Sequence, residues 1–332
     1  MNAGSGYLVI SLDFEMMWGC HDWATVDGYG SSNIRNVRQV ISRMLQLFDK
    51  YNVHATFATV GLIMCDDKKD AILSIPSELP TYKNKLMSPY RTGFMDGITE
   101  ELSDLFFAPD VVELLKNSPG IEIGTHTYGH YYCWEEGQTV AQFKSDIVKA
   151  VEKANEKGVK IKSIVFPKNN VSEEYLNASA EAGLSVYRGN PAHLFGQVGN
   201  KFSALLQKTG RLLDSYIPLT KNTYTLSSVD AKKQIINIPA SRFLRPYSRS
   251  LHYFDWLQVR RINREIVNAA KHGEVYHLWW HPHNFGKDID ANFNILEKIL
   301  RTYTECAEMY KMKSLNMNEL CNIIKSENSI AD

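Results

Sequence analysis

The chain has 332 residues, of which 44% are hydrophobic, and 37 Lys and Arg balance 37 Asp and Glu. The hydrophobic content is enough for a large core and excludes a disordered chain, and the length allows one large domain or two. The balanced charge gives no long-range attraction to nucleic acid or to an anionic membrane, so we expect neither as a partner.

The start of the chain shows no basic stretch followed by a long apolar run, so no signal peptide is expected. No segment approaches the roughly 20 apolar residues of a membrane span. The odd number and wide spacing of the cysteines argue against a disulfide framework or a zinc finger. They are Cys20, Cys65, Cys133, Cys306 and Cys321. We therefore predict a cytoplasmic protein, whose oligomeric state the sequence does not indicate.

Short apolar segments alternate with amphipathic ones along the chain. Strands are expected at residues 7–15, 53–61, 121–127, 162–167, 185–189, 235–239 and 275–280. Helices are expected at residues 33–51, with Asn33 as the N-cap, and at 99–116, 139–157, 172–182, 254–271 and 290–310. The strand segments are continuously apolar, which is typical of strands that are covered on both faces.

This alternation predicts an α/β fold with right-handed crossovers, and about seven strands favour an irregular barrel over an open sheet. We expect a single domain over residues 1–332 with two insertions, at about 62–98 and about 190–233. Insertions at the strand ends of a barrel usually line the active site, although these two could equally be surface loops.

The strongest local motif is Gly124-Thr-His126-Thr-Tyr-Gly-His130, directly after the expected third strand. Two histidines four residues apart in such a place can direct both imidazoles to one point, and neutral imidazole binds zinc and related ions. The pair alone is weak evidence, because two ordinary histidines among tyrosines would give the same pattern.

Two acids at the end of the first expected strand strengthen that motif. Asp13 and Glu15 share a strand face because side chains alternate with period two. Carboxylates on an otherwise apolar strand are costly unless they are paired or bind a metal. One acid could bind the metal while the other acts as a base or holds an imidazole. A structural salt bridge to an arginine is the alternative.

A third motif, His277-Leu-Trp-Trp-His281-Pro-His283, ends the last expected strand. His281 could protonate a leaving group or stabilise an oxyanion. His277, deeper in the strand, fits a core histidine better. His283 is either a substrate contact or a loop residue.

Three further residues are candidates for substrate binding. Lys168 and Asn169 follow the fourth expected strand and could bind sugar hydroxyls, with turn formation as the alternative. Trp18 lies in sequence near the acid pair, where a flat ring could stack on a sugar, although core packing explains most aromatic residues.

The order of these motifs resembles the polysaccharide deacetylase superfamily (carbohydrate esterase family 4), over about residues 7–285. The resemblance implies a distorted (β/α)7 TIM-like barrel with loop insertions. It implies a metal held by Glu15, His126 and His130, with Asp13 as catalytic base and His281 as general acid. The implied cofactor is a divalent metal, foremost Zn²⁺, with Co²⁺, Ni²⁺ or Fe²⁺ as alternatives.

The chain departs from the family pattern in three places. Phe14 separates the two acids, and the second is Glu rather than Asp. No arginine precedes Pro167, so Lys168 or a distant arginine must steady the base. His283 stands near the position where an aspartate often follows the last histidine. These departures indicate a divergent branch, similar to members that act in surface-polysaccharide biosynthesis.

The function that the resemblance implies is hydrolysis of an N-acetyl or other acyl amide group on a sugar or sugar precursor, with metal-bound water as the nucleophile. A nucleotide-linked or lipid-linked sugar is the expected form of this carbohydrate substrate. One alternative is an amidohydrolase of the same superfamily that cleaves a non-sugar C–N bond. Another is a catalytically inactive relative that binds carbohydrate.

Overall fold

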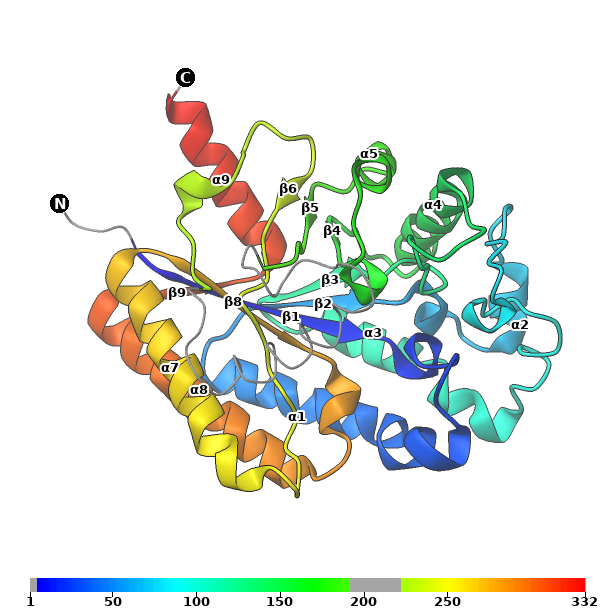
Figure 1. The fold of residues 1–332 in the computed structure, drawn as a ribbon, viewed down its shortest axis with the longest axis horizontal. Helices are drawn as coiled ribbons and strands as arrows, with labels where there is room; N and C mark the ends of the chain where they lie inside the picture. Colours follow the sequence, from blue (N-terminus) through cyan, green and yellow to red (C-terminus); the bar gives the residue numbers. More distant parts are fainter. Residues whose placement is uncertain (1–4, 192–221, 332) are drawn as a thin grey trace.

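A curled parallel sheet surrounded by helices forms the protein in the computed structural model, which describes residues 5–191 and 222–331 (Figure 1). Eight strands follow one another in the order β6-β5-β4-β3-β2-β1-β8-β7, and β9 pairs with β1. The strands are β1 (Tyr7–Phe14), β2 (Ala55–Thr59), β3 (Ile121–Thr125), β4 (Ser163–Ile164), β5 (Val186–Tyr187), β6 (Ile236–Asn237), β7 (Arg242–Phe243), β8 (Val275–Trp280) and β9 (Lys313–Leu315). This architecture confirms the α/β class and the distorted (β/α)7 barrel.

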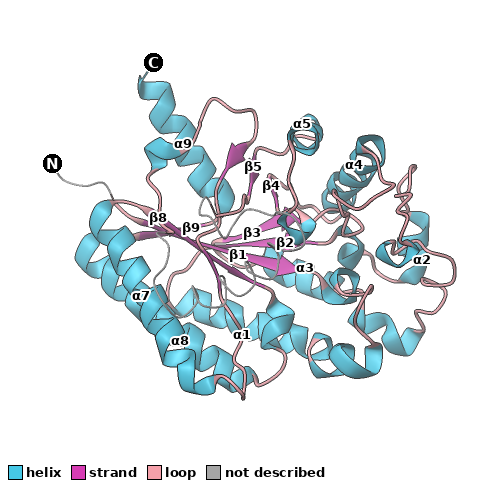
Figure 2. Ribbon diagram, in the orientation of Figure 1, coloured by secondary structure: helices cyan, strands magenta, loops and turns pink. Residues whose placement is uncertain are grey.

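Every strand pair in the sheet is parallel. The carboxyl ends of β1, β2 and β3 therefore meet at one edge, on the right in Figure 2. The longest connections leave the strands at this edge, including residues 60–108 after β2 and 126–139 after β3. Parallel barrels place their active sites at this end, because the loops that follow the strands converge there.

Helices cover the outer face of the sheet, with α1, α7 and α8 along one side in Figure 1. The helices are α1 (Val37–Lys50), α2 (Lys68–Leu73), α3 (Pro109–Lys116), α4 (Val140–Glu156), α5 (Glu173–Glu181), α7 (Asp255–His272), α8 (Ile289–Tyr310) and α9 (Met317–Ala331). In α1 the buried residues recur at helical spacing, as Val37, Val40, Ile41, Met44, Leu45 and Phe48. That stripe packs on the sheet and leaves the opposite face in solvent.

The two faces of β1 pack into different hydrophobic clusters, although all eight residues of the strand are buried. Leu8, Ile10 and Leu12 point outward into the core beneath the helices. Val9 belongs to a second cluster inside the barrel, which α9 closes at the amino end of the strands through Met317 and its neighbours. The inner face thus begins apolar, and by period two it continues into the polar residues at the mouth.

The sequence located most elements but missed their ends. Residues 275–280 form β8 as predicted, whereas β4, β5 and β6 have only two residues each. The single helix predicted at 99–116 is wrong. A 3-10 turn at Glu100–Leu105 precedes α3, whose first residue, Pro109, has no N–H to continue a preceding helix. The strands β7 and β9 and the helices α2 and α9 were not predicted.

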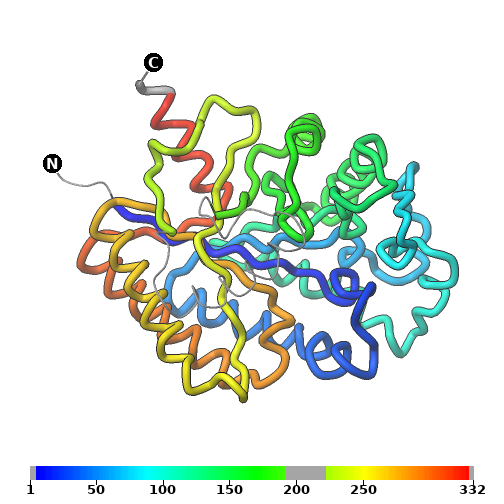
Figure 3. Tube along the Cα trace, in the orientation of Figure 1, coloured from blue at the N-terminus to red at the C-terminus, as the bar shows by residue number. Residues whose placement is uncertain are grey.

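The structure describes the first of the two predicted insertions but only the ends of the second. The first insertion, at about 62–98, contains α2 and short helical turns. The second, at about 190–233, lies mostly outside the described residues, and the single domain remains a prediction. All five cysteines are buried, and none of them forms a disulfide. Among the described residues, no helix combines the length and apolar character that crossing a membrane needs. Figure 3 traces the yellow segment that leads from β7 to α7.

Candidate active site

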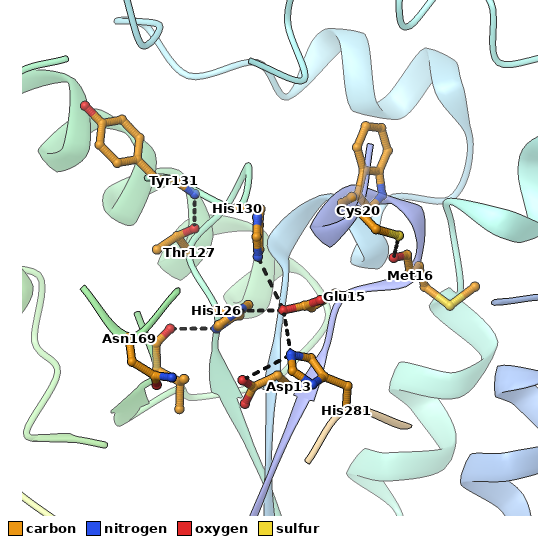
Figure 4. A network of polar contacts seen from close by, with 12 residues as sticks. Asp13, Glu15, Met16, Cys20, His126, Thr127, His130, Tyr131, Asn169 and His281 are labelled. Carbon is orange, nitrogen blue, oxygen red and sulfur yellow. Dashed lines mark hydrogen bonds and ion pairs between the residues drawn. The ribbon is translucent and has the colours of Figure 1, made fainter. Parts of the chain in front are cut away.

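Glu15 is the centre of the polar cluster at the mouth of the barrel (Figure 4). It directly follows β1, and its side chain is only 7% exposed. Its Oε1 lies 3.0 Å from Nε2 of His126, 3.3 Å from Nε2 of His130 and 3.4 Å from Nε2 of His281. One carboxylate oxygen therefore faces three imidazole nitrogens that come from two different strand ends.

The first two histidines are held by the loop between β3 and α4. His126 donates from Nδ1 to the backbone carbonyl of Val165, at 2.7 Å, and its own backbone N–H donates to Thr59. Because Nδ1 carries the proton in that bond, Nε2 presents its lone pair toward Glu15. A fixed tautomer of this kind is what a metal-binding histidine needs from its surroundings. His130 is equally buried, and its backbone is in the left-handed region, with φ of 56°.

Asp13 lies two residues before Glu15, in β1, and is held by an arginine that the sequence analysis did not single out. Arg188, the residue after β5, donates from Nη1 and Nη2 to the two carboxylate oxygens of Asp13, at 2.7 Å each. The guanidinium is fully buried and lies 4.1 Å from the centre of the Trp279 ring. A two-pronged bond of this type fixes the carboxylate in orientation as well as in charge.

Arg188 could have been found from the sequence. It ends a short apolar strand, and a buried arginine is costly unless a carboxylate pairs with it. Residues 185–189 were correctly expected as a strand, yet no pattern indicated which acid the arginine would meet. The pairing joins positions 175 residues apart, which only the curled sheet brings together.

A second polar layer lies beneath Asp13 in the barrel interior. Ser11 accepts a hydrogen bond from Nη1 of Arg188 at 3.0 Å, so its own hydroxyl proton is free to go to Nε2 of His277, at 2.8 Å. Burial and the charge of Arg188 lower the pKa of His277 to about 3, so its ring is neutral. His277 is thus a buried partner of this layer, consistent with its interpretation as a core histidine.

His281 and His283 form the opposite wall of the site, after β8. Nε2 of His281 lies 3.7 Å from Oδ2 of Asp13 in addition to its contact with Glu15. The His283 ring stacks on that of His281, with centroids 5.0 Å apart, and His283 is only 5% exposed. The rings of Tyr29 and His283 make a T-shaped contact, with centroids 5.6 Å apart. The loop therefore presents two histidines to the carboxylates.

The buried charges shift the pKa values of these groups in opposite directions. Burial raises the pKa of Glu15, but the charge of His281 foremost, together with the contacts to His126 and His130, outweighs burial and holds the pKa well below its ordinary value. Burial also raises the pKa of Asp13, but the charge of Arg188 foremost outweighs burial, so the pKa of Asp13 is lowered overall. Burial lowers the pKa of His281, yet Glu15 and Asp13 raise it overall. The arrangement favours two ionised carboxylates beside one protonated imidazole.

The predicted substrate residues have different surroundings. Lys168 pairs with Glu135 at 3.0 Å and lies over the Tyr132 ring, so it does not hold Asp13. Asn169 accepts a hydrogen bond from Nη2 of Arg188 through its side-chain oxygen, at 3.0 Å. Both have positive φ, in a tight turn after β4. Asn169 therefore orients the arginine, and the sugar contacts of these residues and of His283 remain predictions.

The predicted role of Trp18 in stacking on a sugar is wrong. Its side chain is fully buried, its indole N–H donates to the carbonyl of Phe106 at 2.8 Å, and the rings of Phe94, Phe106 and Phe107 surround it. A ring with no open face cannot stack on a sugar. The 3-10 turn after β1 turns Trp18 into the core, and this turn was not predicted.

Gly19 makes room for the Glu15 carboxylate. A Cβ at this position would meet Cβ and Cδ of Glu15, each at 2.5 Å. We expect Gly19→Ala to displace Glu15 and to weaken divalent-cation binding by about tenfold or more, as loss of a supporting contact typically does. Calorimetric titration with Zn²⁺ measures this. Gly97→Ala is the matched control, because its nearest neighbours lie at 3.4 Å. Equal affinities in both variants would contradict the role given to Gly19.

The donors in this cluster fit a divalent cation. Ligand atoms of Glu15, His126 and His130 lie within 4.8 Å of one another, and so do those of Glu15, His281 and His283. One carboxylate with two imidazoles is a set that zinc and related ions accept. The first set has the better support, since its His126 tautomer is fixed by Val165.

Comparison with known proteins agrees with this geometry. Residues 27–187 match the family model described as polysaccharide deacetylase, a range that includes His126 and His130 but not the β1 acids, Arg188 or His281. No curated protein sequence matches the chain.

Solved structures share the fold at low identity. A proposed polysaccharide deacetylase from Mycobacterium smegmatis is 14% identical, with a TM-score of 0.61 over 99% of this chain and 93% of the other. A probable polysaccharide deacetylase from Pseudomonas aeruginosa PAO1 is 13% identical, with a TM-score of 0.54 over 95% and 89%. Puue allantoinase is 12% identical, with a TM-score of 0.52 over 95% and 89%. At these identities the likeness concerns the fold alone.

Proposed function

Because the chain belongs to the polysaccharide deacetylase superfamily, we propose that it is a metal-dependent hydrolase that removes an N-acetyl or other acyl group from an amino sugar. The observation that carries the proposal is the position of Glu15, whose Oε1 faces His126, His130 and His281 beside an arginine-held Asp13.

Glu15, His126 and His130 would hold the cation. Glu15 suits this role better than Asp13, because both oxygens of Asp13 are already bound by Arg188. A divalent ion, of which Zn²⁺ is our first choice, would supply Lewis acidity for the acyl oxygen and for a water. This assignment answers, as a proposal, the question that the sequence left open between the two acids.

Asp13 is the proposed base. The pKa that Arg188 holds low keeps the carboxylate ionised and able to accept a proton from water as the water attacks the acyl carbon. Arg188 and Asn169 keep its oxygens in place through the reaction. The base is therefore oriented by residues of β5 and of the turn after β4.

His281 is the proposed acid. Its Nε2 lies between the two carboxylates, which raise its pKa and favour the protonated ring that a leaving nitrogen requires. Proton donation to the sugar nitrogen then completes C–N cleavage, and the products are an amino sugar and a carboxylate such as acetate.

His281→Ala is expected to lower kcat by about 10²–10⁴-fold, the usual contribution of one acid–base group, while binding of Zn²⁺ is kept. Steady-state kinetics and metal analysis of the same preparation measure the two effects. His272→Ala, an exposed histidine at the end of α7, is the control. Loss of metal from His281→Ala would show that this histidine is a ligand instead of the acid.

The substrate class follows from the family, and its form is a further proposal. We propose a carbohydrate precursor of surface polysaccharide, in nucleotide-linked or lipid-linked form. Metal analysis combined with an acetate-release screen on nucleotide-activated N-acetyl sugars tests it. Metal-loaded protein that releases no acetate, but hydrolyses a cyclic ureide, would favour the amidohydrolase alternative; the shared fold of the allantoinase keeps that alternative in view. Protein that binds sugar but catalyses neither reaction would be the inactive relative.

A further inference from the structure

Asp146 is a buried carboxylate on α4 that reaches the loop between the two proposed histidine ligands. Asp146 is only 1% exposed. Oδ1 accepts the backbone N–H of Tyr128 at 2.7 Å, and Oδ2 accepts that of Gly129 at 2.9 Å. These two amides lie midway between His126 and His130.

The backbone of this loop needs external support. The backbones of Thr127 and His130 lie in the left-handed region, with φ of 65° and 56°, a conformation that residues other than glycine rarely adopt. Such conformations persist only where the surrounding contacts determine them. The hydroxyl of Thr127 accepts the N–H of Tyr131 at 2.7 Å, and its carbonyl accepts the N–H of Gly61. Asp146 supplies the contacts for the two residues in between.

The carboxylate is costly where it lies. Burial raises the pKa of Asp146 to about 7 against the effect of its two N–H donors. Among the described residues, no lysine, arginine or histidine forms an ion pair with it, in contrast to Asp13, which has Arg188. A buried carboxylate without a cation partner costs folding free energy, so Asp146 is not explained by a gain in stability from an ion pair.

A second, half-buried carboxylate has a purely structural role and offers a comparison. Glu122, on β3 at the amino end of the barrel, accepts hydrogen bonds from Thr56, from Ser163 and from the N–H of Asn318 at the start of α9. It holds α9 to the sheet, far along the strand from the histidines. Glu122 and Asp146 therefore both accept hydrogen bonds through their carboxylate oxygens but meet different parts of the molecule.

We propose that Asp146 is a positioning residue for the cation site: it holds the Tyr128–Gly129 amides so that His126 and His130 direct their Nε2 atoms to one point. The inference rests on the proposed function, because it needs Glu15, His126 and His130 to be ligands. Asp146 acts through the loop and touches neither substrate nor cation.

The test compares Asp146→Asn with Glu122→Gln in the full chain. An asparagine has one acceptor oxygen and turns an N–H₂ toward one of the two amides. We expect the dissociation constant for Zn²⁺ to rise about 10–100-fold in Asp146→Asn, as on loss of outer partners of metal ligands, and to stay at the wild-type value in Glu122→Gln. Calorimetric titration gives the constants, and thermal unfolding of both variants without metal gives their stability. The visible spectrum of bound Co²⁺ is expected to change in Asp146→Asn alone.

The outcomes are distinct. Wild-type affinity and spectrum in Asp146→Asn overturn the positioning role. Equal loss of affinity in both variants, in step with their stability, also overturns it and makes Asp146 a purely structural residue. Wild-type protein that binds no divalent cation refutes the cation site itself, and the positioning role falls with it. If Asp146→Asn does not fold, Asp146→Ser, which keeps one acceptor in a smaller side chain, takes its place under the same criteria.

Discussion

Replacing Arg188 by methionine is expected to reduce the free energy of unfolding by about 3–5 kcal/mol, because it leaves the buried Asp13 without its cation. The same change raises the pKa of Asp13, since burial is no longer opposed by the guanidinium. Arg188 lowers that pKa in the wild type, so its contribution to stability is present above the unfolded pKa of Asp13 and is lost as pH falls through the folded one. The acid limb of kcat/KM is therefore expected to move to higher pH in the variant. Denaturant unfolding and a pH–rate profile measure the two effects.

Two further variants separate charge, geometry and general stability. Arg188→Lys keeps a cation but cannot bind both oxygens of Asp13 at once, so we expect intermediate stability and activity. Arg242→Met removes another buried arginine, which pairs with Glu265 on the outer side of the sheet. It should lose stability while its pH profile stays that of the wild type. A shifted profile in Arg242→Met, or an unshifted one in Arg188→Met, would contradict the role of Arg188.

Replacing His126 by alanine is expected to remove both metal and activity. It deletes a proposed ligand, so the loss of cation affinity should exceed the roughly 10–100-fold that loss of an outer partner costs. Metal analysis after dialysis and acetate release from an N-acetyl sugar measure the two losses. His54→Ala is the matched control, since His54 pairs with Glu319 at the opposite end of the barrel.

The result that would refute the proposed function is equally definite. Full activity in His126→Ala, together with full activity in metal-stripped wild-type protein, would exclude a metal-dependent mechanism at this site. Activity that falls in His54→Ala as far as in His126→Ala would show that the loss reflects the fold.

The parts of the site that could be predicted are those encoded by local patterns. Asp13, Glu15, His126 and His130 stand next to continuous apolar strands, and period-two alternation together with the position after a strand sufficed to bring them together. The structure places His126 and His130 next to Oε1 of Glu15, and His281 lies between Glu15 and Asp13, as Figure 4 shows. Their chemical roles remain proposals.

The parts that were missed depend on contacts between distant segments. Asn33 was expected to cap a helix, but its side chain donates to the carbonyl of His283 and the helix α1 begins at Val37. Trp18 was a candidate for stacking on a sugar, and a 3-10 turn places it in the core. Arg188 was overlooked because its partner lies on another strand. In each case a tertiary contact, absent from any local window, decides where the side chain lies.

The pairing of β1 has a consequence for how the chain acquires its structure during synthesis. This strand lies in the middle of the sheet, yet it pairs with β8 along Tyr7–Leu12 and with β9 along Tyr7–Val9. Its apolar edge therefore has no partner until some 270 further residues have left the ribosome, and the last of its partners comes near residue 315. Pairings this distant make folding slow and leave hydrophobic segments exposed in the meantime. The sheet is thus fully paired only after β8 and β9 have been synthesised, and nascent chains that stop short of β8 are the species that should need protection by chaperones.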